Sequence, residues 1–236
     1  MADVLEDATV VDLGRQSVRE LNAALHALGP ETNRAHWRVL NPAGRHAVAV
    51  GMTQPVTVEI VGHAGYYCAG MNQHATVVLH GNAATGVAEN MMSGMVHVRG
   101  DASQSAGASA HGGLLLIDGN AAARCGISLK DGDIVVKGSV GHLSAFMAQA
   151  GTLVVLGDAG DSLGDSIYEA HLYVRGRVAG LGADCIEKPM RDRHRAELHA
   201  KLEAAGLAGE VDIGDFRRYG SARRLYNFHI DNAAAY

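Results

Sequence analysis

Seven glycines recur at an unbroken spacing of 19 residues, and this spacing limits the folds that are open to the chain. They are Gly62, Gly81, Gly100, Gly119, Gly138, Gly157 and Gly176. A fixed period over so long a stretch is typical of a repeat protein, in which each repeat packs only on its neighbours.

Each repeat also has two aliphatic positions, four and two residues before its glycine, as in Val58 and Ile60 before Gly62. Side chains two apart in a strand face the same side, so each repeat predicts a strand with one buried face. Turn-forming Asn, Asp or Ser mostly follows the glycine, and too few residues remain for a long helix. The leucine-rich repeat signature is absent. We therefore predict a mainly β fold, a single-stranded right-handed parallel β-helix of about seven 19-residue coils with short flanking helices.

The flanking segments divide the chain into three predicted parts. Residues 1–56 form an N-terminal flanking segment, 57–188 the β-helix domain and 189–236 a C-terminal helix and docking tail. A capping box at Ser17 and Glu20 predicts a short helix over 17–28.

A second helix is expected to start at Pro189 and run to Gly206, with Glu197 and Lys201 paired one turn apart. Both helices are expected to cover the open ends of the β-helix, which would otherwise expose unpaired backbone.

Composition indicates a cytoplasmic protein. The net charge of −5 gives no reason to expect nucleic acid or a membrane as partner, and no apolar run approaches the ~18 residues of a membrane span. The N-terminus lacks the pattern of a secretory signal. Three cysteines are an odd number, and Cys68 and Cys125 lie three coils apart, beyond disulfide reach, so we expect reduced thiols.

A catalytic set is harder to find in the sequence. Cys125 and His142 are weak catalytic candidates, because adjacent coils would make them diagonal neighbours about 7–8 Å apart, which would need only a nearer approach for the imidazole to take the thiol proton. The alternative is that Cys125 belongs to a column of small packing residues. The histidines fall in different columns and no phosphate-loop motif is present, so we expect no metal and no cofactor in this chain.

One outward-facing column is apolar in the last four coils, where polar residues would be expected. Its members are Leu116, Val135, Val154 and Tyr173. Exposed apolar strips often mark contact surfaces, so this strip is a predicted partner interface. The alternative is that the chain's own N- or C-terminal segment covers it. The aromatic and basic tail is assigned to the same interface through Phe216, Arg217, Arg218, Arg223, Arg224, Tyr226 and Phe228.

The coils resemble the Gly-x-Gly-x-Gly β-helix of the glutamate synthase large subunit and of the formylmethanofuran dehydrogenase C subunit. Five motifs resemble more closely the stand-alone β-helix subunit of N-methylglutamate synthase. They are Glu89-Asn90-Met91-Met92-Ser93-Gly94, Ala110-His111-Gly112-Gly113, Arg124-Cys125-Gly126-Ile127-Ser128, Gly141-His142-Leu143-Ser144-Ala145-Phe146-Met147 and Leu163-Gly164-Asp165-Ser166-Ile167-Tyr168-Glu169. The resemblance covers roughly residues 56–190.

This resemblance implies a non-catalytic scaffold in a multi-subunit enzyme that converts glutamate and methylamine to N-methylglutamate and ammonia. The implied partners are a glutamine-amidotransferase-like subunit and an FMN-binding glutamate-synthase-like subunit that also holds an iron–sulfur cluster. Cys68, Cys125 and Cys185 lack iron–sulfur spacing, so the cluster is expected in the partner.

Two alternatives remain at this point. One is a C subunit of a formylmethanofuran dehydrogenase or formyltransferase/hydrolase complex, which would share the coils. The other is an independent enzyme that uses Cys125 and His142.

Overall fold

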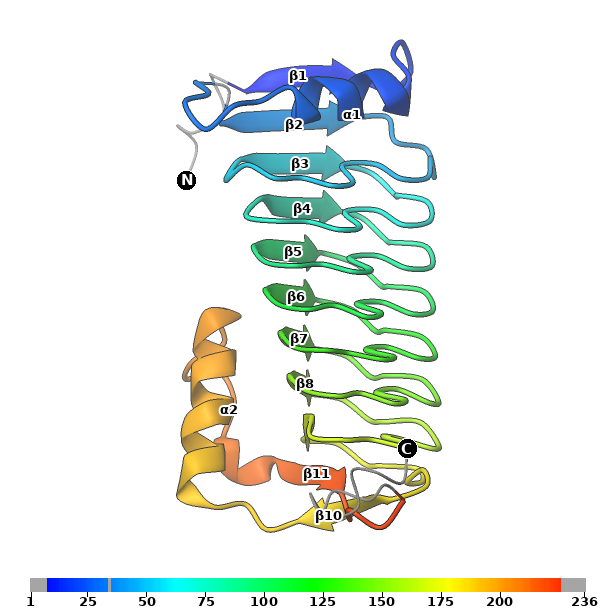
Figure 1. The fold of residues 1–236 in the computed structure, drawn as a ribbon, viewed down its shortest axis with the longest axis vertical. Coiled ribbons are helices and arrows are strands. Elements are labelled where there is room, and N and C mark those ends of the chain that lie inside the picture. Colours follow the sequence, from blue (N-terminus) through cyan, green and yellow to red (C-terminus); the bar gives the residue numbers. More distant parts are fainter. Residues whose placement is uncertain (1–7, 34, 226–236) are drawn as a thin grey trace, which may run out of the picture.

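A computed structural model describes residues 8–33 and 35–225, and its strands form one sheet that runs the length of the molecule (Figure 1). The strand order is β1-β2-β3-β4-β5-β6-β7-β8-β9-β11-β10. The strands are β1 (Thr9–Asp12), β2 (His36–Leu40), β3 (Thr57–Val61), β4 (Thr76–His80), β5 (Met95–Val98), β6 (Leu114–Ile117), β7 (Asp133–Val136), β8 (Thr152–Val155), β9 (His171–Val174), β10 (Cys185–Lys188) and β11 (Arg217–Ser221). The helices are α1 (Val18–His26) and α2 (Asp192–Ala204), with a short 3-10 turn η1 (Ile213–Asp215).

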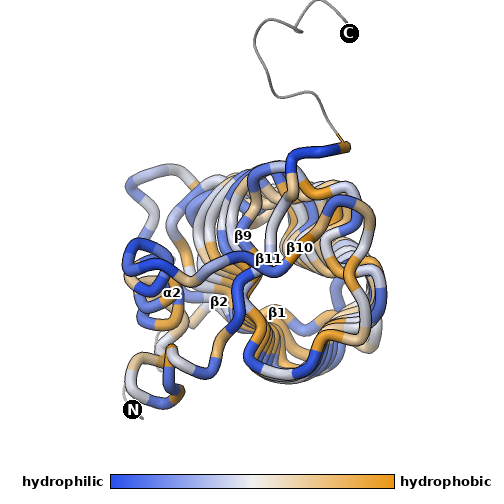
Figure 2. The backbone as a smooth tube through the Cα atoms, turned by 90° about the horizontal axis from the view of Figure 1, so that it is seen from below, coloured by the Kyte–Doolittle hydropathy of each residue, from blue (hydrophilic) through white to orange (hydrophobic). Residues whose placement is uncertain are grey.

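Strands β3 to β9 confirm the predicted parallel β-helix. Successive strands pair in register 19 residues apart, so that Val58 lies beside Val77 and Val77 beside Val96. Both aliphatic columns are buried and form one continuous core. Viewed along the solenoid axis, the coils superimpose closely (Figure 2).

The sheet also extends into the segment predicted to flank it. Strand β1 pairs in parallel with β2, and β2 with β3. Trp37 and Val39 of β2 are buried beside Val58 and Ile60, so residues before 57 continue the same core.

A ladder of polar side chains joins the turns after the strands. The backbone N–H of Asp101 donates to Asn82 Oδ1 at 3.0 Å, and that of Asn120 donates to Asp101 Oδ1 at 2.7 Å. The same contact recurs one coil at a time from His63 to Arg177. These turn residues therefore bond the next coil in addition to shaping their own turn.

Helix α1 confirms the prediction made from its capping box. Ser17 Oγ accepts the N–H of Glu20 at 3.2 Å, and Glu20 Oε2 accepts the N–H of Ser17 at 2.7 Å. Leu21 and Leu25 are buried in the solenoid core, and the Asn22 side chain bonds the backbone of Ala47 and Ala49.

Helix α2 forms within the predicted range, but it does not cover an end of the solenoid. It lies along the outer face of the sheet, while β10 and β11 cross the C-terminal end (Figure 1). Helix α2 lies there because its buried residues pack against the apolar strip. These residues of α2 are His194, Leu198 and Leu202.

The strip itself is therefore not a free surface. Leu116, Val135, Val154 and Tyr173 are at most 2% exposed and pack with α2 and the segment that follows it. The prediction that these four residues contact a partner protein is wrong, because the chain's own C-terminal part covers them. The alternative left open by the sequence, an intramolecular cover, is correct.

Candidate functional site

The weak catalytic pair does not form. Cys125 is fully buried in the solenoid core, whereas His142 is exposed. Burial raises the pKa of the Cys125 thiol to about 12, which opposes formation of a thiolate. The burial of Cys125 therefore argues against the weak candidates Cys125 and His142, and the packing interpretation fits Cys125.

The other cysteines are buried as well. Burial raises the pKa of Cys68 and of Cys185 to about 12 in each case. Among residues 8–33 and 35–225, no group of three or more His, Cys, Asp or Glu could hold a metal ion. Three buried thiols in separate coils do not fit an iron–sulfur cluster.

The interface residues predicted in the C-terminal docking tail lie in several separate environments. Phe216 is buried against the apolar strip, and Arg218 is buried in β11, which corrects their assignment to an exposed partner surface. Arg217, Arg223 and Arg224 are exposed. Tyr226 and Phe228 lie outside the described residues.

Two charged contacts fasten α2 to the solenoid. Glu197 accepts hydrogen bonds from Tyr173 and from His171 Nδ1, the latter at 2.8 Å. Lys201 Nζ lies 3.0 Å from Asp133 Oδ2 in β7. Glu197 and Lys201 thus each bind a side chain of the solenoid, where the sequence predicted that they would pair with each other.

The Glu197 contacts change the pKa of both partners. Burial acts to raise the pKa of Glu197, but the hydrogen bonds from His171 and Tyr173 outweigh it and lower the pKa to about 2. Burial and the adjacent Glu197 raise the pKa of Tyr173. Glu197 is therefore a carboxylate that accepts from a protonated phenol at ordinary pH.

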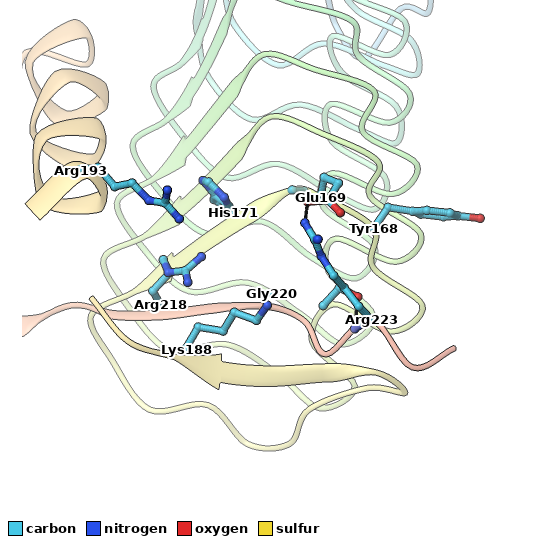
Figure 3. Close-up of a pocket in the computed structure, with 10 residues that line it drawn as sticks. Tyr168, Glu169, His171, Lys188, Arg193, Arg218, Gly220 and Arg223 are labelled. Atoms are coloured by element: carbon cyan, nitrogen blue, oxygen red, sulfur yellow. Dashed lines mark hydrogen bonds and ion pairs between the residues drawn. The ribbon is translucent and has the colours of Figure 1, made fainter. Parts of the chain in front are cut away.

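A polar cavity of about 190 Å³ lies where β9, β10, β11 and the start of α2 meet (Figure 3). Its lining contains four cationic side chains, those of Lys188, Arg193, Arg218 and Arg223, and a single carboxylate, that of Glu169. His171 lies at the same wall. The sequence pattern did not predict this cationic cavity.

Sheet register brings two of these cations together. Lys188 lies directly opposite Arg218 in the antiparallel pair of β10 and β11. Like charges at directly opposite positions are unfavourable. Burial lowers the pKa of Lys188, and the charges of Arg218 and Arg223 lower it further.

One acid partially compensates this charge, because Arg223 Nη2 lies 2.7 Å from Glu169 Oε2. Among the described residues, no carboxylate lies within ion-pair distance of Lys188, Arg193 or Arg218. The Arg-rich tail was visible in the sequence, but its return to β9, which builds the cavity, was not.

The comparisons with known proteins place the chain in a family. No protein-family model matches it. The chain is 60% identical over 227 residues to "Protein GlxC" of Rhizobium meliloti (strain 1021), an alignment that covers 96% of the chain and 99% of that protein.

The chain belongs to the GlxC family. Because the alignment covers 99% of Protein GlxC, the two chains share the repeat region and both flanking segments. The β-helix, its α2 cover and the cationic cavity are therefore all within the part of the chain that the GlxC relative matches. No helix in the described residues is long and apolar enough to cross a membrane.

Proposed function

We propose that this GlxC-family chain is a non-catalytic scaffold subunit of a glutamate-synthase-related enzyme, namely an N-methylglutamate synthase. The complex would make N-methylglutamate and ammonia from glutamate and methylamine. This chain would hold together a glutamine-amidotransferase-like subunit and an FMN-binding subunit with an iron–sulfur cluster.

The observation that carries the proposal is where the resemblance motifs lie. All five fall in the segments between the strands, on stacked coils. Several adjacent motifs are bonded directly, since the N–H of Ser128 donates to Phe146 O at 2.8 Å and that of Met147 to Asp165 O at 2.9 Å. The motifs thus lie on consecutive stacked coils between β4 and β9, which suits a subunit that positions other chains.

The buried thiols support a non-catalytic role for the isolated chain. Cys125 has no exposed sulfur and no adjacent base among the described residues, so an independent Cys/His enzyme is not supported. The interface role predicted for the docking tail is retained for Arg217 and Arg224, which are exposed.

Purification of the complex from native cells without crosslinking tests the proposal. We expect an amidotransferase-like chain and a yellow flavoprotein to accompany this chain, and methylamine-dependent formation of N-methylglutamate. A colourless lone protein would contradict the proposal, and a formyltransferase partner would indicate the one-carbon alternative.

A charge reversal tests the tail. We expect Arg224→Glu to weaken recovery of the partners while the Tm of the isolated chain stays unchanged, because the structure describes only backbone contacts for this residue. The matched control is Arg15→Glu, an exposed site at the other end of the chain.

A further inference from the structure

We propose that the cavity between β9, β10, β11 and α2 is a binding site for a phosphate group, a property separate from the scaffold function. Positive charge is gathered around a small, partly open cavity, and the His194 ring beside it can accept only one of the two hydrogen bonds directed at it.

The first observation is uncompensated positive charge. Lys188, Arg193 and Arg218 come from three different elements and line one cavity, as Figure 3 shows. Its volume is about 190 Å³. Glu169 is the carboxylate of the lining, and it is already bound to Arg223. A net charge of this sign in so small a space attracts an anion.

The second observation concerns hydrogen-bond acceptors near Arg193. Its Nε lies 3.1 Å from His194 Nε2, while His194 Nδ1 lies 3.1 Å from the N–H of Arg191. A neutral imidazole has a single acceptor nitrogen, so it can satisfy only one of these donors. The His194 ring is buried, and the pKa of its imidazole is lowered by burial and by Arg218, which keeps it neutral. One donor is therefore left without an acceptor on the ring, and in the tautomer that protonates Nε2 this donor is Arg193 Nε, which an oxygen-rich ligand in the cavity would satisfy.

The third observation is the buried guanidinium of Arg218. It is 8% exposed, lies opposite Lys188, and its Nε has only a long contact of 3.4 Å to Pro189 O. Burying a charge without a charged partner is costly. Glu197 gives Arg218 some electrostatic compensation, and an anion bound between Lys188 and Arg218 would add to it and reduce the repulsion between the two cations.

Size and charge favour phosphate over other anions. The cavity is smaller than the roughly 300–1,000 Å³ of sites for drug-sized ligands, so the ligand group is compact. Three cations that form no ion pair with a carboxylate of the described residues suit a group that carries more than one negative charge, and a phosphate carries about −1.5 to −2 at neutral pH. Arginine forks also match the geometry of phosphate oxygens.

The test uses the full chain and inorganic phosphate as the probe. We expect phosphate to raise the Tm in a saturable way, above any change produced by sodium chloride of equal ionic strength. Lys188→Met and Arg193→Gln should each weaken phosphate affinity about tenfold or more in calorimetric titration, because each loses a charged hydrogen bond. The control Lys130→Met makes the same change in net charge on another coil and should leave the affinity unchanged.

Lys188→Met also separates binding from a structural role. Without phosphate its Tm should equal or exceed that of the original chain, because a like-charge pair is removed. Equal effects of phosphate and chloride, or unchanged phosphate affinity in Lys188→Met, would overturn the proposal, as would saturable binding of succinate in place of phosphate. Tighter binding of a phosphate monoester would support a phosphorylated molecule as the source, whereas preference for the inorganic ion would support free phosphate.

Discussion

Tyr173 donates a hydrogen bond to Glu197, and this bond joins the last parallel strand of the solenoid to helix α2. His171, on the same strand, binds the same carboxylate oxygen at 2.8 Å. The contact lies beside the apolar strip, so it holds the helix over residues that would otherwise be exposed to water.

We expect Glu197→Gln to lower the free energy of unfolding by about 1–3 kcal/mol, since a neutral amide is a weaker acceptor for Tyr173 and His171. Urea unfolding followed by circular dichroism measures the change. Glu203→Gln, on an exposed position of the same helix, is the control and should alter stability by less than about 0.5 kcal/mol. An equal loss in both variants would show that the contact adds no stability.

Lowering the pH should destabilise the protein through protonation of Glu197. The pKa of Glu197 is about 2 in the folded chain and lies below its ordinary value of 4.5. Because the pKa of Glu197 is lower in the folded chain than in the unfolded chain, the ionised carboxylate stabilises the fold at pH values above 4.5. This contribution is lost as the pH falls from 4.5 towards 2. The Tm of Glu197→Gln should therefore depend less on pH over this interval than the Tm of the original chain. Parallel Tm curves would refute the assignment.

Helix α2 should depend on its buried leucine. Leu198 is fully buried against the strip, so Leu198→Ala should cost about 2–5 kcal/mol, as large-to-small changes in a core do. Leu181→Ala, at a position that is 40% exposed, provides the same chemical change with a smaller expected cost. If denaturant titration gave equal losses for the two variants, α2 would not be packed as described.

The packing of α2 over the apolar strip can be tested separately. Val154→Glu should destabilise the isolated chain, because it places a charge at a fully buried position under α2. A thermal melt measures this directly. An unchanged Tm would instead support the interpretation of the strip as a free surface.

The polar ladder between coils predicts that each of its positions needs a side chain that accepts a hydrogen bond from the next coil. Asn120→Ala should cost about 1 kcal/mol, because the N–H of Ser139 loses its bond to Asn120 Oδ1. Asn120→Ser should retain more stability, since Ser139 serves the same role for Asp158 with a hydroxyl at 2.9 Å. Chemical denaturation measures the free energy of unfolding of both variants. If Asn120→Ala were more stable than Asn120→Ser, the ladder would not contribute as described.

Buried thiols should be unreactive in the folded chain. Because burial raises the pKa of Cys68, Cys125 and Cys185 to about 12, a thiol reagent at mildly alkaline pH should label them only after unfolding. Absorbance of the released chromophore counts the labelled thiols. Rapid modification of Cys125 in the native protein would reopen its catalytic assignment.

Much of the fold followed from the repeat because each coil has the same two buried positions. Strand β2 was missed because its buried Trp37 and Val39 lie 21 residues before Val58 and Ile60, outside the period of 19. The alternation of Trp37 and Val39 was still a usable signal. For α2, the sequence indicated the helix and the strip but not their contact, which depends on the path of the connecting chain.

The cavity was less predictable than the fold. Its cations come from β10, α2 and β11, and only the antiparallel return of β11 onto β9 places Arg218 beside Lys188. No local pattern encodes such a return. The sequence therefore indicated an unusual concentration of arginine without indicating what it surrounds.

The length of helix α2 limits where the solenoid could accommodate additional coils. Its 13 residues extend about 20 Å, close to the roughly 19 Å taken up by four stacked coils. The strip from Leu116 to Tyr173 has the same four coils. A coil inserted there would separate Asp133 from Lys201 or leave apolar residues uncovered, whereas one inserted between β3 and β5 would keep every such contact. Family members of different length should therefore vary in coil number near the N-terminal end and remain constant beneath the helix.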